Sequence, residues 1–219
     1  MHVKICGIKT VMDAQLAEQC GADAIGVLVG RVHRSKDFIT LKTAAEICGT
    51  VGPFTATVLV THFEDPEKIL QLAEQVSTSA IQLHSDLPPQ TIRMLARKLS
   101  PRKIIAKVSV DGPDAIHRAR KVSKYADAIL LDSINPETKQ VGGTGHTHDW
   151  TLSAQIVKES SIPVILAGGL TPKNVARAIQ RVNPYGVDVN TGVKNRAGGK
   201  SQKRIREFLR LAKGKLSII

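Results

Sequence analysis

Two side chains in this sequence could act as a general base and a general acid. Cys6 ends the apolar run in MHVKIC, and Asp132 ends the apolar run in AILLDS. A thiol has an ordinary pKa of about 8.5, so it can accept a proton near neutral pH where a positive charge, here Lys4 or Lys107, stabilises its thiolate. A carboxyl group must have a raised pKa to donate a proton. Each residue also has a simpler interpretation: Cys6 as a small core residue and Asp132 as a cap on the following loop.

Glycine-rich segments follow two other apolar runs and could bind an anion. Gly168 and Gly169 lie in PVILAGGLTPKNV, and Asn190, Thr191 and Gly192 lie in DVNTGVK. Glycine allows the backbone to approach a ligand closely, and exposed backbone amides favour phosphate. The two segments therefore predict a phosphate-binding site.

A long polar segment, INPETKQVGGTGHTHDW, follows Ser133 and predicts a binding or covering role rather than a simple connection. It contains His146 and His148, which are possible metal ligands. A third ligand at a suitable spacing is missing, so the sequence predicts no metal site.

Short apolar runs alternate with amphipathic stretches along the whole chain, a pattern typical of repeated βα units. Strands are predicted near eight segments, namely Val3–Cys6, Ala24–Val29, Thr55–Val60, Ala80–Leu83, Ile104–Val108, Ala128–Leu131, Val164–Ala167 and Val187–Val189. Helices are predicted to start near Thr10, Thr40, Asp65, Pro88, Gly112, Asp149, Thr171 and Lys200, with Asp65-Pro66 and Thr171-Pro172 as start signals. This order predicts an α/β fold, a single (β/α)8 TIM barrel over residues 1–219.

A barrel of this kind builds its active site at the carboxyl ends of its strands. The polar residues at those ends should therefore meet, and they are Cys6, Gln82, His84, Lys107, Asp132, Gly168, Gly169 and Asp188 through Gly192.

The composition limits the partners and the cellular location. The net charge of +12 suits an anionic small substrate or a nucleic acid, but only 3% of the residues are aromatic, which disfavours a base-stacking surface. Part of the positive charge lies between Lys200 and Lys215, where a solvated helix face is the simplest interpretation. The three cysteines lack metal-ligand spacing and follow no secretory segment, which predicts a cytoplasmic protein, and no apolar run is long enough to span a membrane.

Several segments, taken together and in order, resemble the phosphoribosylanthranilate isomerase family of tryptophan biosynthesis. They are KICGIKT, GADAIG, IQLH, ILLDS, GGTGHTHDW, PVILAGGLTPKNV and GVDVNTGV. The resemblance implies an Amadori rearrangement of N-(5-phosphoribosyl)anthranilate that needs no cofactor and no metal. It implies that Cys6 is the base that removes the proton from C2 of the sugar, and that Asp132 is the acid that protonates the ring oxygen. The glycine-rich segments would hold the phosphate, and His84 and Asp188 would face the substrate.

The chain departs from the family pattern in the segment VHRSKDFI. Asp37 stands where the family carries an arginine that holds the anthranilate carboxylate, and Lys194 stands where an acidic residue is usual. A carboxylate cannot bind another carboxylate unless one of them is protonated. Arg31, Arg34 or Lys36 could replace the missing cation, and Arg34 is the preferred candidate.

Three functions remain open from the sequence. The first is the isomerase itself, with a small anionic phosphosugar as substrate and with no nucleic-acid or membrane partner. The second is an isomerase of another phosphorylated N-glycoside or amino sugar. The third is a non-catalytic barrel that binds a phosphorylated metabolite, which would need neither Cys6 nor Asp132. The oligomeric state could be a monomer or a homodimer.

Overall fold

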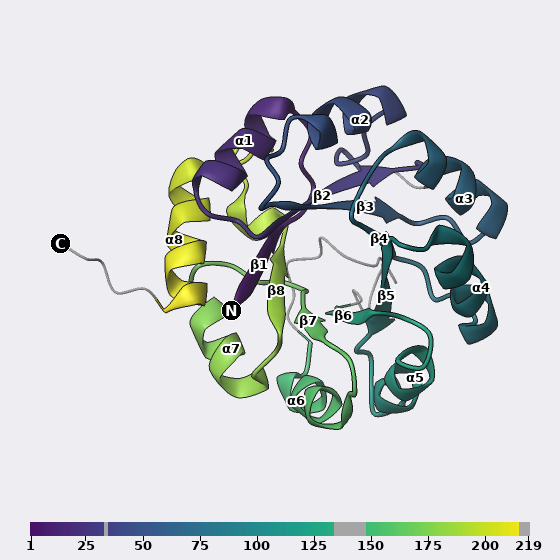
Figure 1. The fold of residues 1–219 in the computed structure, drawn as a ribbon. Coiled ribbons are helices and arrows are strands. Elements are labelled where there is room, and N and C mark those ends of the chain that lie inside the picture. The colour runs from purple at the N-terminus through teal and green to yellow at the C-terminus, as the bar shows by residue number, and fades with distance from the viewer. Residues whose placement is uncertain (33–34, 134–147, 215–219) are drawn as a thin grey trace.

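Eight parallel strands close into a barrel in the order of the sequence, which confirms the predicted fold (Figure 1). The computed structural model describes residues 1–32, 35–133 and 148–214. Every strand pairs with the next along the chain, and β1 pairs with β8, so that Lys4 lies opposite Asp188. The strands are β1 His2–Ile5, β2 Ala24–Val29, β3 Ala56–Thr61, β4 Ala80–Leu83, β5 Lys103–Ser109, β6 Ala128–Asp132, β7 Val164–Leu166 and β8 Gly186–Val189.

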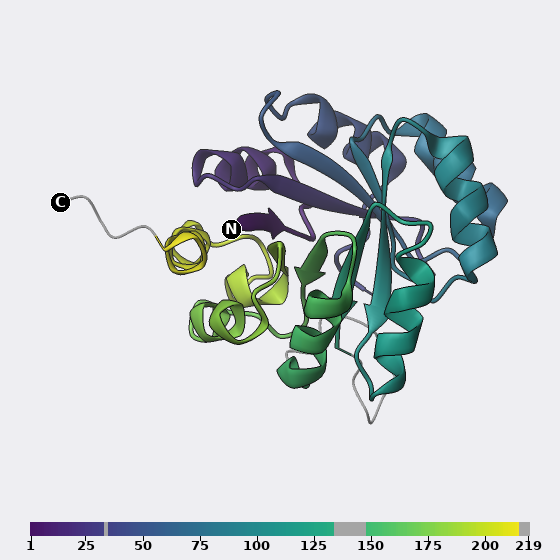
Figure 2. The same cartoon turned by 60° about the horizontal axis from the view of Figure 1, so that its bottom comes forward.

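Helices surround the barrel, and a view turned by 60° again shows them outside the strands (Figure 2). They are α1 Val11–Gln19, α2 Leu41–Gly49, α3 Pro66–Gln75, α4 Pro89–Leu99, α5 Asp114–Val122, α6 Trp150–Glu159, α7 Val175–Val182 and α8 Gln202–Lys213. A short 3-10 helix, η1 Thr191–Val193, follows β8. The main apolar core lies between the strands and these helices.

Most of the helix starts follow the predicted capping residues. The side chains of Thr10, Thr40, Asp65 and Asp149 each accept a hydrogen bond from a backbone N–H in the first turn of their helix.

The predicted helix start at Thr171 is wrong, because α7 begins at Val175 after a turn. Asn174 holds this turn: its side-chain oxygen accepts a hydrogen bond from the Thr171 N–H at 2.8 Å, and its amide donates to the Gly169 carbonyl at 3.0 Å. These local bonds compete with an earlier helical turn.

Alternation along the strands decides which side chains enter the barrel. On β1, Val3 and Ile5 belong to the outer core, whereas Cys6, directly after β1, belongs to the smaller cluster inside the barrel. Lys4 also lies inside, bonded to Gln82 and Asp188 from β4 and β8. Inward residues of β1, β4 and β8 therefore meet inside the barrel.

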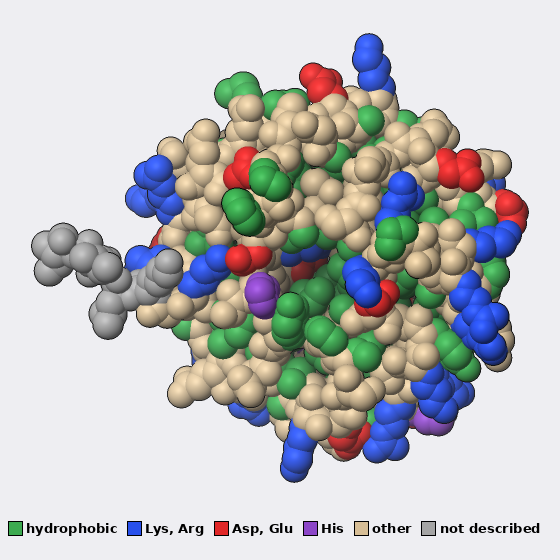
Figure 3. All heavy atoms as spheres, viewed as in Figure 1, with side chains coloured by type: hydrophobic (Ala, Val, Ile, Leu, Met, Phe, Trp, Pro, Cys, Tyr) green, Lys and Arg blue, Asp and Glu red, His purple; other side chains and the backbone are tan. Residues whose placement is uncertain are grey.

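Positive charge is spread over several helices. Figure 3 shows Lys and Arg side chains around the edge of one face, several of them over α4 and α5, whose last turns carry Arg97, Lys98, Arg120 and Lys121. The predicted solvated face from Lys200 onward is wrong for Lys200, which is 6% exposed. Within the described ranges, no helix is long and apolar enough to cross a membrane.

Candidate active site

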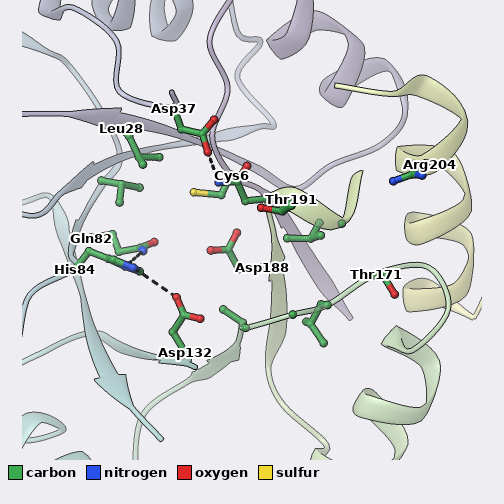
Figure 4. A pocket seen from close by; sticks show the side chains of 18 of the residues that line it. Cys6, Leu28, Asp37, Gln82, His84, Asp132, Thr171, Asp188, Thr191 and Arg204 are labelled. Atoms are coloured by element: carbon green, nitrogen blue, oxygen red, sulfur yellow. Dashed lines mark hydrogen bonds and ion pairs between the residues drawn. The ribbon is translucent and has the colours of Figure 1, made fainter. Parts of the chain in front are cut away.

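A cavity of about 590 Å³ opens at the carboxyl ends of the strands (Figure 4). Cys6, His84, Asp132 and Asp188 line it, so the predicted catalytic and substrate-facing side chains do meet. The predicted phosphate residues line it as well, namely Gly168, Gly169, Asn190, Thr191 and Gly192. This grouping follows from the barrel, because the residues lie at or after the carboxyl ends of five strands, β1, β4, β6, β7 and β8.

Cys6 contributes a buried thiol to the cavity wall. Its side chain lies against Gly26 of β2, where a Cβ atom would come within 2.9 Å of the Cys6 sulfur and 3.3 Å of the Lys4 ammonium nitrogen. Burial raises the pKa of Cys6, and the charge of Lys4 opposes this increase. Lys4 is therefore the cation beside the thiol. Lys107, the other candidate, forms an ion pair with Asp86 at 3.2 Å.

Asp132 is suited to hold a proton near neutral pH. It is 5% exposed, and burial raises its pKa to about 7, with the Asp188 charge adding to the effect. One of its carboxyl oxygens accepts a hydrogen bond from the Ser133 N–H at 2.7 Å, which fixes the orientation of the group. This bond means that Asp132 also caps the following loop, which was its alternative role. The other carboxyl oxygen remains directed toward His84.

A chain of buried polar side chains links Lys4 to Asp132. The Lys4 ammonium donates to the Gln82 side-chain oxygen at 2.9 Å, so the Gln82 NH₂ group must face His84 Nδ1, which lies 2.9 Å away. His84 Nδ1 is therefore the acceptor, and in the neutral ring the proton lies on Nε2, 3.5 Å from the second Asp132 oxygen. Gln82 consequently sets the tautomer of His84.

Asp188 lies between Cys6 and Asp132 in the view of Figure 4. One of its oxygens accepts a hydrogen bond from Lys4 at 2.8 Å. The other oxygen is buried and has no hydrogen-bonding partner among the described residues. Since Asp188 lines the cavity, this oxygen can accept a hydrogen bond from a ligand hydroxyl group.

The two glycine-rich loops lie directly against each other. A Cβ atom on Gly192 would lie 2.0 Å from the Leu170 carbonyl oxygen, and a Cβ atom on Gly168 would lie 2.8 Å from the Ser133 nitrogen. Gly168 and Gly169 have φ values of 79° and 62°, which favour glycine. Only glycine fits at positions 168 and 192, and the resulting backbone surface can receive an anion.

Asp37 is buried in the cavity wall and is already paired. Lys194 donates to both of its oxygens at 2.6 Å, and the Asn190 amide donates to one of them at 2.9 Å. Burial works against the charged form, but the bonds from Lys194 and Asn190 lower the pKa of Asp37 overall. Arg34 lies outside the described residues; Arg31 and Lys36 are exposed and are not among the residues that line the cavity.

Sequence reasoning missed some residues of the site. His62 and Arg204 line the cavity but follow no recognisable motif; His62 simply continues the inward alternation of β3, which was the available signal. Nothing in the sequence distinguished Lys200, which is buried, from the other basic residues of its segment.

Residues 134–147, with His146, lie outside the described residues, and His148 bonds to Ser153 at 2.7 Å. The described part of the chain holds no group of three or more potential metal ligands.

Known proteins resemble this chain over almost its whole length. The family model described as N-(5'-phosphoribosyl)anthranilate (PRA) isomerase matches residues 3–210. N-(5'-phosphoribosyl)anthranilate isomerase 2 of Methanosarcina mazei is 45% identical over 97% of this chain and 94% of its own length.

Solved structures agree with this match. One holds monomers generated from the dimeric phosphoribosylanthranilate isomerase of Thermotoga maritima, with a TM-score of 0.84 and 32% identity, covering 98% of this chain and 100% of that one. Another is a phosphoribosylanthranilate isomerase in complex with reduced 1-(o-carboxyphenylamino)-1-deoxyribulose 5-phosphate. Its TM-score is 0.82 and its identity 33%, and the match covers 98% of this chain and 100% of that one. This chain belongs to the N-(5'-phosphoribosyl)anthranilate isomerase family.

Proposed function

We propose that this chain catalyses the Amadori rearrangement of N-(5'-phosphoribosyl)anthranilate, the aldose-to-ketose isomerisation of tryptophan biosynthesis. The observation that carries the proposal is the pairing of Asp132, whose pKa is raised to about 7, with the Cys6 thiol in one cavity. The reaction needs an acid and a base on one sugar, and each group is placed to take one role. The rearrangement requires no cofactor.

In the first step, Asp132 donates its proton to the ring oxygen of the sugar. The C1–O bond breaks, the ring opens, and the nitrogen lone pair forms a protonated imine at C1. Cys6, as the thiolate, then removes the proton from C2. The C2–H electron pair forms the C1–C2 double bond and the imine electrons return to nitrogen, which gives an enol amine. The enol amine becomes the C2 ketone when C1 takes up a proton and the C2 hydroxyl group loses one, so the net proton count does not change. Lys4 stabilises the thiolate, and His84, through its Nε2 proton, holds the Asp132 carboxylate formed in the first step.

The remaining polar groups would bind and orient the substrate. The phosphate would lie on the backbone of the Gly168-Gly169 and Asn190 to Gly192 loops. Asp188 would accept a hydrogen bond from a sugar hydroxyl group through its unpaired oxygen. These placements predict that inorganic phosphate or sulfate occupies the glycine loops.

A second candidate is an isomerase of another phosphorylated N-glycoside, and Asp37 is the observation that favours it. The family resemblance implies that the anthranilate carboxylate needs a cation at this position, whereas this chain has a carboxylate there, paired with Lys194. Arg34 remains our preferred cation for that carboxylate. Arg34→Ala should weaken binding of N-(5'-phosphoribosyl)anthranilate by about 1.5 to 3 kcal/mol, and Lys36→Ala should have little effect.

Turnover of N-(5'-phosphoribosyl)anthranilate by the purified chain tests the proposal directly. Wild type should be active, and Cys6→Ser should lower kcat by roughly two to four orders of magnitude because a hydroxyl group is too weak an acid to form the needed anion. Asp132→Asn should lower kcat while a product analogue still binds, since the acid acts in the transition state. Wild type should also restore growth of a tryptophan auxotroph that lacks this isomerase.

Other outcomes would favour the competing functions. A folded wild-type protein that binds phosphate but turns over only another phosphorylated N-glycoside would establish the second candidate. Normal activity of Cys6→Ser would remove the base assignment, and binding without turnover of any such substrate would favour a non-catalytic barrel.

Two further properties belong to this proposal. The chain would act in the cytoplasm, where its free cysteines Cys6, Cys20 and Cys48 would stay reduced. It would be a monomer or a homodimer, and light scattering on the purified protein distinguishes the two.

A further inference from the structure

Lys200 is a buried cation behind the cavity, and the mechanism above does not use it. The residue is 6% exposed and precedes α8. Its ammonium group donates to the Cys6 carbonyl at 2.5 Å, to the Asn190 carbonyl at 3.3 Å and to the Asn190 side-chain oxygen at 3.0 Å. Its own backbone N–H donates to Asp13 of α1 at 3.1 Å. Two separate segments therefore bond to the Lys200 side chain, and a third bonds to its backbone.

The contacts of Lys200 fix the backbone that carries the thiol. Cys6 follows the last residue of β1, and its N–H donates to the Val189 carbonyl of β8 at 2.9 Å. Gly7 packs so closely against Asn190 that a Cβ atom on Gly7 would lie 2.4 Å from its side-chain oxygen. The Lys200 ammonium thus bonds to both sides of the β1–β8 junction at the position of Cys6.

Charge adds to this geometry. The charged groups that act on Cys6 are Lys4 of its own strand, Asp188 of β8 and Lys200 of the segment before α8. Burial lowers the pKa of Lys200 to about 8, while the charges of Cys6, Asp37 and Asp13 favour its protonated form and Lys194 opposes it. A Cys6 thiolate and a Lys200 ammonium would therefore stabilise each other.

We propose that Lys200 is a positioning residue for the Cys6 base: it fixes the Cys6 backbone against the end of β8 and supplies a second positive charge, beside that of Lys4, to the thiolate. This inference rests on the proposed function only in taking Cys6 as the base. Lys200 is not among the residues that line the cavity, so it acts through Cys6 and not on the substrate.

The test measures the Cys6 thiol without any substrate. Since the chain has three cysteines, the variants are made in a Cys20→Ser, Cys48→Ser background that leaves Cys6 as the only thiol. The rate of Cys6 alkylation by iodoacetamide is followed from pH 6 to pH 10. The variants are Lys200→Met, which removes the charge at similar length, Lys200→Arg, which keeps the charge, and Lys203→Met, an exposed control on α8.

In the Met variant, the thiolate fraction at a given pH should fall roughly tenfold, which corresponds to one pKa unit. The same variant should show kcat lowered about tenfold or more, with KM changed less than about threefold, because the substrate does not touch Lys200. The Arg variant should recover part of both losses, and the control should match the parent. If the Met variant does not fold, Lys200→Gln replaces it with the same expectations.

An alkylation profile of the folded Met or Gln variant that matches the parent would overturn the proposal. So would an Arg variant that recovers nothing while its melting temperature stays normal. Because alkylation needs no substrate, these outcomes are independent of whether wild type turns over N-(5'-phosphoribosyl)anthranilate. Failure of that turnover would reject the proposed function alone.

Discussion

The Lys194 ammonium lies 2.6 Å from each carboxylate oxygen of Asp37, although the two residues are 157 positions apart in the sequence. Their side chains are 17% and 10% exposed, so the pair is largely shielded from water. The Asn190 amide completes the bonding of Asp37. The family resemblance places an arginine at position 37 and an acidic residue at position 194, so this chain holds the same two charges in exchanged places.

The exchange predicts that reversing the charge of either residue alone destabilises the fold. Asp37→Arg would place its guanidinium beside Lys194 and lose a shielded ion pair, so the free energy of unfolding should fall by on the order of 3 kcal/mol. Adding Lys194→Glu restores an opposite pair and should recover most of that loss. Urea unfolding of the two single variants and the double variant measures the coupling.

The double variant also tests the substrate. If anthranilate is the natural aglycone, Asp37→Arg with Lys194→Glu should keep or raise kcat/KM on N-(5'-phosphoribosyl)anthranilate, because it returns the expected arginine to position 37. Activity on this substrate that exists only in the double variant would mean that wild type acts on a different aglycone. In the urea measurements, the double variant could instead lose as much free energy of unfolding as Asp37→Arg and Lys194→Glu lose together. That result would show that the two side chains are not energetically coupled.

Gly192→Ala should abolish the predicted phosphate site. The added Cβ atom would lie 2.0 Å from the Leu170 carbonyl oxygen, so the two glycine-rich loops would have to separate. We expect KM for the phosphosugar and the inhibition constant for inorganic phosphate to rise at least tenfold, or the protein to lose its fold. Gly49→Ala is the matched control, because its Cβ atom would meet nothing within 4 Å and alanine favours the helix it ends. Unchanged phosphate inhibition in a folded Gly192→Ala variant would place the anion elsewhere.

Sequence patterns were sufficient for the barrel because parallel strands buried on both faces appear as short apolar runs. Once the strands were placed, the barrel itself brought Cys6 and Asp132 to one end, so both catalytic candidates could be named in advance. The start of α7 could not be predicted from the sequence, because the Asn174 side chain bonds locally in place of another helical turn. The pairing of Asp37 with Lys194 and the burial of Lys200 depend on contacts between distant segments, and a single sequence gives no signal for such contacts.

The raised pKa of Asp132 predicts how kcat depends on pH. The acid must be protonated to open the sugar ring, and burial raises its pKa to about 7. We therefore expect kcat to fall as pH rises above about 7, with a slope of about one decade per pH unit where the proton transfer limits the rate. Where proton donation by Asp132 limits the rate, a kcat that stays constant from pH 6 to pH 9 would argue against Asp132 as the acid. Where proton removal by Cys6 limits the rate instead, the rising thiolate fraction would offset the fall.

The same carboxyl group should make the stability of the fold depend on pH. The folded-state pKa of about 7 exceeds the ordinary value of 3.8, so between these values the native state holds a proton that the unfolded chain has lost. The contribution of this proton to the free energy of unfolding is fully present below about pH 4 and is lost as pH rises through about 7. Asp132→Asn cannot ionise, so from pH 4 to pH 8 it should gain stability relative to wild type, on the order of 4 kcal/mol. Urea unfolding at both pH values measures this difference, with the exposed Asp114→Asn as the control. An equal response of the two variants to pH would mean that Asp132 ionises normally in the folded protein and could not serve as the acid near neutral pH.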